Sequence, residues 1–304
     1  MSTWLDAFVP AFALLALGAL LKRRLLRDDA VWAGMERLIY WVLLPSLIVA
    51  ALAPLNLAEL PLGRIAAAIW GALALGTLVS VLLARAMGLG HPAMTSVLQG
   101  GIRFNNLMGF AIVGALFGTA GTGFGAVATG IIVPFVQTVT TLAFALDGKR
   151  GPPRPVAILR QLAFNPLLLA VAIGFGIAAL GGLPAGLAPT VQALGRASVA
   201  LGLLCVGAAL SLQSFSDRLG VQAATGVLKL LVMPAVTWVL CLAFGVPPLA
   251  TAVAVVFMAL PTAATSYVMA RALGGDAPLM AAITTTQHIA SVVTLPLWVL
   301  LVAP

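Results

Sequence analysis

The feature that most constrains the fold is a series of apolar segments, each about 20 residues long, that fills almost the whole chain. A helix of that length matches the roughly 30 Å hydrocarbon core of a bilayer. The residues are 62% hydrophobic and only 8% charged, whereas a soluble domain has about 25% charged residues. The segments do not alternate with period two, which disfavours a β-barrel. The sequence therefore predicts an all-α polytopic membrane protein embedded in a lipid bilayer.

Ten membrane-spanning helices are predicted from these segments. The basic residues lie mainly in the loops that follow odd-numbered segments, and such loops face the cytoplasm. Both termini are therefore expected outside. The net charge of +8 is interpreted as this topology signal, and no nucleic-acid partner is expected because few aromatic residues accompany the basic ones. The predicted segments are 4–21, 32–53, 63–86, 92–118, 123–146, 157–180, 187–213, 219–244, 248–272 and 277–302.

A weak internal repeat divides the ten segments into two sets of five. At a spacing of 156 residues, Pro92 pairs with Pro248 and Gly118 with Gly274. The repeats would span 1–146 and 157–304, joined by a basic cytoplasmic linker at 147–156. Because five is odd, the second repeat must enter the membrane from the opposite side. Inverted repeats with interrupted helices at matching positions are typical of secondary transporters.

Two predicted helices are interrupted at matching positions. The segment 92–118 contains Arg103 and the pair Asn105-Asn106 near its centre, and it is expected to break over 105–109. The segment 248–272 is expected to break at Pro261. The freed backbone groups must face protein or a wet cavity, so we expect the two breaks to cross each other. The helix N-termini that follow the breaks favour an anion.

Three basic or titratable side chains inside the predicted segments have two interpretations each. Arg103 lies too deep to reach the interface easily, so it either contacts a substrate or binds the carbonyls freed by the break. Lys229 is either a second anion contact or a partner for buried carbonyls. His288 is either a proton carrier or a neutral, hydrogen-bonded ring. It belongs to an inward-facing polar stripe, which comprises Thr284, Gln287, His288 and Ser291.

The acidic residues and cysteines argue against several site types. All eight acidic residues lie at segment ends or in loops, so ion coupling through an intramembrane carboxylate is doubtful. Sodium held by backbone carbonyls and hydroxyls remains open. Cys205 and Cys241 fall inside apolar segments and are interpreted as small core residues. No metal and no cofactor are expected, and no enzymatic activity, because Ser291 and His288 have no buried carboxylate to orient them.

Several of these segments resemble the auxin efflux carrier family. The similarity covers nearly the whole chain and includes FVPAFALLALGALLKRRLL near the start, NNLMGFAIVGALFG at the first break, and LPTAATSYVMARALGGDAPLMAAITTTQHIASVVTLPLWVLL at the end. The resemblance implies two inverted five-helix repeats, scaffold and transporter domains each drawn from both repeats, and breaks in the fourth and ninth helices that cross at the site. It also implies elevator-type movement, admits a homodimer, and suggests organic anions such as malonate or malate as substrates.

The sequence thus favours a secondary transporter of small carboxylate anions in a bacterial inner membrane. The alternative is a sodium-coupled symporter of the bile-acid type, which shares the ten-helix plan; an intramembrane enzyme or a channel is more remote. The expected substrate-binding residues flank the two breaks or lie on the last helix: Gln99, Arg103, Asn105, Asn106, Pro261, Thr262, Thr265, Gln287 and His288.

Overall fold

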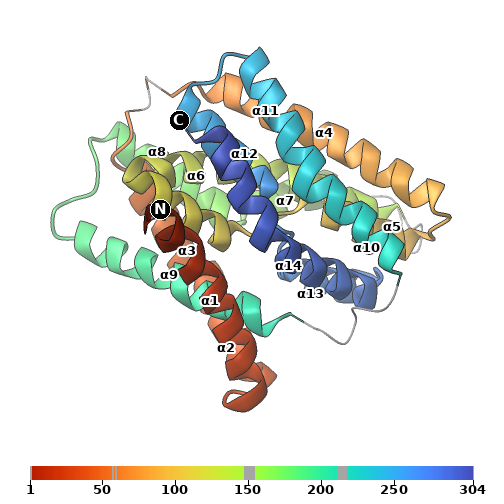
Figure 1. Cartoon of the computed structure of the whole chain (residues 1–304). Coiled ribbons are helices and arrows are strands. Elements are labelled where there is room, and N and C mark those ends of the chain that lie inside the picture. Colours follow the sequence, from red (N-terminus) through yellow and green to blue (C-terminus); the bar gives the residue numbers. More distant parts are fainter. Residues whose placement is uncertain (1, 57, 59, 147–154, 211–217, 304) are drawn as a thin grey trace. The chain divides into compact units, whose positions relative to one another are not determined.

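The described residues of the computed structural model are almost entirely helical and contain no strand, as the sequence predicts. They comprise residues 2–56, 58, 60–146, 155–210 and 218–303, and Figure 1 follows them from red to blue. Seven helices among them are long and apolar enough to cross a membrane. The number rises to eight if α7 (Pro155–Ala163) and α8 (Pro166–Ala179), which are bent by 56°, form one span. The chain is therefore a multi-pass helical membrane protein.

The predicted number of ten spans depends on the two interrupted segments. Each begins with a helix of only 12 residues, α5 (His91–Ile102) and α12 (Pro248–Ala259), whereas a helix needs about 20 residues to span the bilayer. After the first break, α6 (Asn106–Ala145) itself contains a bend at Gly118, where φ is 59°. The glycine accommodates this left-handed conformation without a steric penalty. Ten spans in two inverted repeats stay a prediction.

The chain forms two compact units, and each unit draws on both halves of the sequence. Unit 1 comprises residues 1–62, 107–130 and 163–209, and unit 2 comprises 63–106, 131–162 and 210–304. Of the predicted linker at 147–156, residues 147–154 lie outside the described part of the chain. The helices of unit 1 are α1 (Ser2–Arg24), α2 (Asp29–Leu38), the π-helix η1 (Ile39–Leu43), α3 (Leu44–Leu52), the start of α6, α8, and α9 (Ala188–Ala208).

In unit 1, α1 and α9 approach each other through glycines on both helices. A Cβ added to Gly18 would lie 2.0 Å from the carbonyl oxygen of Leu204, and one added to Gly207 would lie 2.0 Å from that of Leu15. No side chain fits at such distances. Small residues at helix interfaces allow this close approach, which drives helix association in lipid through van der Waals contacts.

Unit 2 is built around α14 (Ala277–Val302), which packs against α5, α10, α12 and α13. All residues of α12 from Ala250 to Ala259 are buried, and so are Thr95 to Ile102 of α5. The two short helices therefore belong to the interior of the unit. The other helices of unit 2 are α4 (Leu62–Ala86), the end of α6, α7, α10 (Leu219–Val227), the π-helix η4 (Leu228–Val232), α11 (Met233–Ala243) and α13 (Thr265–Leu273).

Among the described residues, a proline follows each of the two π-helices. Pro45 follows η1 and Pro234 follows η4, and a proline has no N–H for the carbonyls of the preceding turn. In η4 one of these carbonyls obtains another partner, because the indole N–H of Trp298 donates to the Leu230 oxygen at 2.8 Å. The wider turn of η4 is therefore hydrogen-bonded to α14. π-bulges of this kind are frequent at functional sites.

We expect Gly18→Ala and Gly207→Ala to lower the melting temperature of the detergent-solubilised protein. The added Cβ would collide with backbone atoms, and overpacking costs about 1–3 kcal/mol. Gly176→Ala in α8 is the matched control, since a Cβ there meets nothing within 4 Å. Because alanine has a higher helix propensity than glycine, by about 1 kcal/mol, Gly176→Ala should not destabilise α8. An unchanged melting temperature in both α1 and α9 variants would contradict the close packing.

Candidate functional site

The site is built from two breaks in unit 2 that contact each other. The first follows α5, where Arg103 is extended with φ −76° and ψ 163°, and α6 begins at Asn106. The second follows α12, where Leu260 is extended with φ −63° and ψ 144°, as expected for a residue that precedes a proline. The backbone N–H of Asn105 donates to the Pro261 carbonyl at 2.8 Å. Backbone groups freed by one break are thus satisfied by the other.

The first break does not lie where the sequence analysis put it. The prediction was residues 105–109, but the break covers 103–105, and Asn106 to Gly109 are helical. Asn105 bonds to the second break instead of continuing the helix of α5. The Asn-Asn pair therefore marks the start of the next helix, where asparagine is favoured just before the first turn, and Gly109 interrupts nothing.

Gln287 of α14 joins both breaks. Its Nε2 donates to the Gly100 carbonyl at 2.9 Å, and its Oε1 accepts from the backbone N–H of Thr262 at 2.9 Å. The Thr262 hydroxyl in turn donates to the Gln99 carbonyl at 3.1 Å. Gln99, Thr262 and Gln287 are all 0% exposed. One amide side chain thus satisfies a donor and an acceptor that would otherwise be costly to bury.

His288, the next residue on α14, contacts the first break through the side chain of Asn105. Its Nδ1 lies 2.7 Å from the Thr284 carbonyl and its Nε2 lies 3.1 Å from Nδ2 of Asn105. A carbonyl only accepts, so Nδ1 carries a proton, and Nε2 accepts from the amide. This arrangement fits the neutral, hydrogen-bonded ring, which is one of the two interpretations of His288. The predicted stripe is confirmed as inward-facing, since Thr284, Gln287, His288 and Ser291 are all buried.

Arg103 connects the first break to the start of α13. Its Nη2 donates to the Thr265 hydroxyl at 3.0 Å, and its Nη1 lies 2.8 Å from Sδ of Met269 and 3.4 Å from Oε1 of Gln99. The side chain is partly exposed and Thr265 is exposed. The guanidinium therefore lies at the accessible edge of the break.

All nine predicted site residues belong to unit 2. Hydrogen bonds join eight of them into two adjacent groups: one comprises Gln99, Arg103, Thr262, Thr265 and Gln287, and the other comprises Asn105, Pro261 and His288. Their role as substrate contacts stays a prediction. Met269 was not predicted, because an apolar thioether on a helix gives no signal of a polar contact in the sequence. Gly100 was also missed as a hydrogen-bond partner, since it contributes only its carbonyl oxygen.

Two buried nitrogen atoms near the breaks have no hydrogen-bond partner among the described residues: Nε2 of Gln99 and Nζ of Lys229. Lys229 lies in η4 and is 0% exposed. Of its two interpretations, the structure gives no support to a role as donor to buried carbonyls in the described part of the chain. Each of the two cysteines is free and buried, as predicted.

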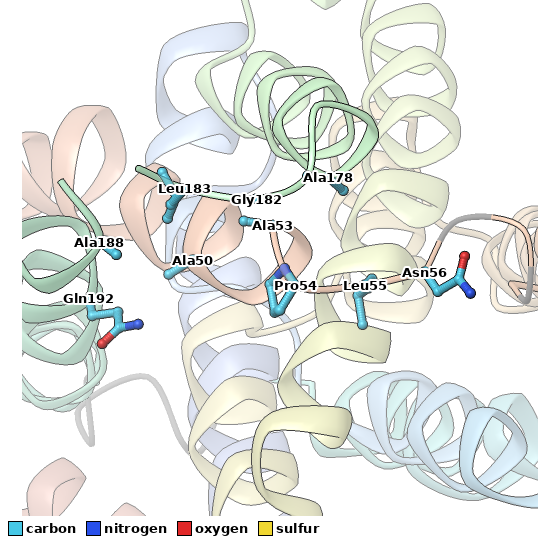
Figure 2. Close-up of a pocket in the computed structure, with 11 residues that line it drawn as sticks. Ala50, Ala53, Pro54, Leu55, Asn56, Ala178, Gly182, Leu183, Ala188 and Gln192 are labelled. Carbon is cyan, nitrogen blue, oxygen red and sulfur yellow. The ribbon is translucent and has the colours of Figure 1, made fainter. Parts of the chain in front are cut away.

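A separate pocket lies in unit 1, between the ends of α3 and α8 and the start of α9 (Figure 2). Its volume is about 430 Å³. Figure 2 shows Asn56 and Gln192 as its polar side chains, and the rest of its lining consists of Ala, Gly, Leu and Pro residues. With no charged side chain among its lining residues, this pocket suits an anion less well than the cluster around Arg103. The described residues also contain no group of three His, Cys, Asp or Glu side chains that could hold a metal.

We expect Gln287→Met to lower the free energy of unfolding by about 1–3 kcal/mol, because the variant leaves the Gly100 carbonyl and the Thr262 N–H buried without their partner. Chemical denaturation of the detergent-solubilised protein measures the loss. Gln192→Met, in the pocket of unit 1, is the matched control and should change stability little. Equal stability of the two variants would show that the breaks do not depend on the Gln287 bridge.

Comparison with known proteins identifies the family to which this chain belongs. The family model described as "Membrane transport protein" matches residues 4–299, which is nearly the whole chain. A search of curated proteins finds no match. The match agrees with the resemblance of the two breaks and of the last two predicted helices to auxin efflux carriers, and the family is one of transporters, not of enzymes. The chain therefore belongs to the auxin efflux carrier family of membrane transport proteins.

Proposed function

We propose that this protein is a secondary transporter of small carboxylate anions, which bind at the contact between the two breaks. The observation that carries the proposal is the position of Arg103, whose partly exposed guanidinium lies between the end of α5 and the first residue of α13. A guanidinium presents N–H donors in a planar fork that matches a carboxylate. The helices α6 and α13 both begin at these breaks, and helix N-termini favour negative charge.

The charge of unit 2 also favours an anion. Asp276 is the only acidic side chain among the described residues of this unit, and it forms an ion pair with Arg218, with Oδ2 and Nη2 2.6 Å apart. The described basic residues of the unit comprise Arg64, Arg85, Arg103, Arg160, Arg218, Lys229 and Arg271. A substrate carboxylate would offset this excess of positive charge.

The accessible residues define which groups would meet the substrate first. Arg103, Asn106 and Thr265 are partly or fully exposed, whereas Asn105, Gln287 and His288 are buried. We assign the first three to direct contact. The buried residues then shape the site by holding the two broken backbones in place, and the substrate meets the rim of that framework.

We propose that alternating access occurs by movement of unit 2. Every proposed site residue lies in unit 2, so the site could travel with that unit while unit 1 stays fixed, as in an elevator. The close, glycine-mediated packing of α1 on α9 supports the proposal that unit 1 is the fixed scaffold. We further propose a bacterial inner-membrane location with both termini outside, and a homodimer as the assembly.

We expect malonate, malate or succinate to raise the melting temperature of the wild-type protein, and Arg103→Ala to abolish the increase. A ligand at 100 times its Kd stabilises a protein by about 2.7 kcal/mol. Arg85→Ala is the matched control, because it removes the same charge from an exposed position at the end of α4 in the same unit. The dimethyl esters of the same acids should have no effect.

Two results would contradict this assignment. If Arg103→Ala retains the full shift, Arg103 supports only the broken backbone. If the shift appears only when sodium is present, the sodium-coupled symporter becomes the better description. The screen is therefore run with sodium and with choline as the cation.

A further inference from the structure

Lys229 is the one buried charged residue in the described part of unit 2, and the proposed binding site does not use it. It is 0% exposed, and its Nζ has no hydrogen-bond partner among the described residues. It lies in the π-helix η4, which packs against α5, α10, α11, α12 and α14. Burying an ammonium group without a partner costs several kcal/mol, so its presence in the core requires an explanation.

The elements around η4 provide no opposite charge. No acidic residue occurs in α5, α10, α11, α12 or α14. Their titratable groups are His91 on α5, Cys241 on α11 and His288 on α14. His91 contacts the Ala143 carbonyl through Nε2, and both nitrogens of His288 are engaged by Thr284 and Asn105. An ammonium at Lys229 could therefore be compensated only by an anion from outside this set.

Neighbours of Lys229 along its helix lie against the end of α5, which leads into the proposed anion site. A Cβ on Gly100 would lie 2.8 Å from Cγ2 of Thr225, one turn before Lys229, and a Cβ on Gly101 would lie 3.2 Å from Cδ2 of Leu228. These glycines immediately precede the first break. The turn that carries Lys229 is thus packed against the same backbone that leads to Arg103.

We propose that Lys229 binds the proton that accompanies the substrate, so that the transporter couples anion movement to proton movement. This inference rests on the proposed function, because the negative charge that allows Lys229 to be protonated is the substrate carboxylate. Without substrate the neutral amine avoids the cost of a buried charge that has no partner. With substrate bound, the carboxylate makes protonation of Lys229 favourable, and by linkage the proton strengthens anion binding by the same factor.

The experiment measures proton uptake when malonate, malate, succinate or acetate is added to the purified full-length protein in weak buffer with a pH indicator. Across neutral and mildly alkaline pH, wild-type protein should take up a proton for each anion bound. Because binding then requires a proton, affinity should fall as the pH rises, by up to about tenfold per pH unit. Lys229→Met should bind with an affinity that does not depend on pH and should take up no proton.

Lys22→Met is the matched control, since Lys22 is the other lysine in the described residues and forms an ion pair with Asp29 in unit 1. It should behave as the wild type. Lys229→Arg, which keeps a permanent charge, should bind anions without proton uptake and so tests the coupling if the methionine variant does not bind. Lys229→Met should also be at least as stable as the wild type, because an apolar side chain replaces an unpaired buried amine.

The outcomes separate this inference from the proposed function. Anion binding without proton uptake in the wild type would overturn the coupling role and leave the transporter of carboxylates intact. Proton uptake that persists in Lys229→Met would assign the proton to another group, with His288 the first candidate. If none of the four carboxylates binds the wild-type protein, the proposed function fails, and the coupling role fails with it.

Discussion

The structure of unit 2 depends on satisfying backbone groups that two interrupted helices leave without partners. In a bilayer no water replaces them, so each must bond to protein or to a wet cavity. The Asn105 N–H reaches the Pro261 carbonyl, and Gln287 takes one acceptor from the first segment and one donor from the second. The short helices α5 and α12 are buried for the same reason. The core of this unit is thus arranged around two helix breaks whose freed backbone groups find hydrogen-bond partners within the unit.

The sequence predicted those features that follow from composition and from proline. The apolar segments indicated a helical membrane protein, and Pro261 indicated a helix end, which the extended Leu260 confirms. The polar stripe on α14 followed from helical spacing, and its residues are buried as expected. Helical periodicity and the missing N–H of proline act locally, so a single sequence is sufficient to find them.

The features that the sequence analysis did not predict depend on contacts between distant segments. The first break begins at Arg103 and not at Asn105, because the decisive bond is made with a residue in the other half of the chain. The π-helices also went unnoticed, although Pro45 and Pro234 are visible in the sequence. A proline shows that a helix bond is lost, but whether the helix kinks, ends or widens depends on partners such as Trp298.

The two breaks lie at matching positions of the predicted repeat but differ in their residues, and this difference bears on how a transporter can place charge. The helices α5 and α12 begin 157 residues apart, at His91 and Pro248, and have equal lengths. Yet Arg103 of the first break corresponds to Leu260 at this spacing, and the second break carries only leucine, proline, threonine and alanine. Lys229 in η4 likewise corresponds to Ala72 in α4 at this spacing. In the predicted repeat, similar backbones can make similar hydrogen bonds, so the shared part would maintain the breaks. The unequal part supplies the charges, and the proposed selectivity for an anion would originate there, because a backbone framework of paired donors and acceptors is by itself neutral.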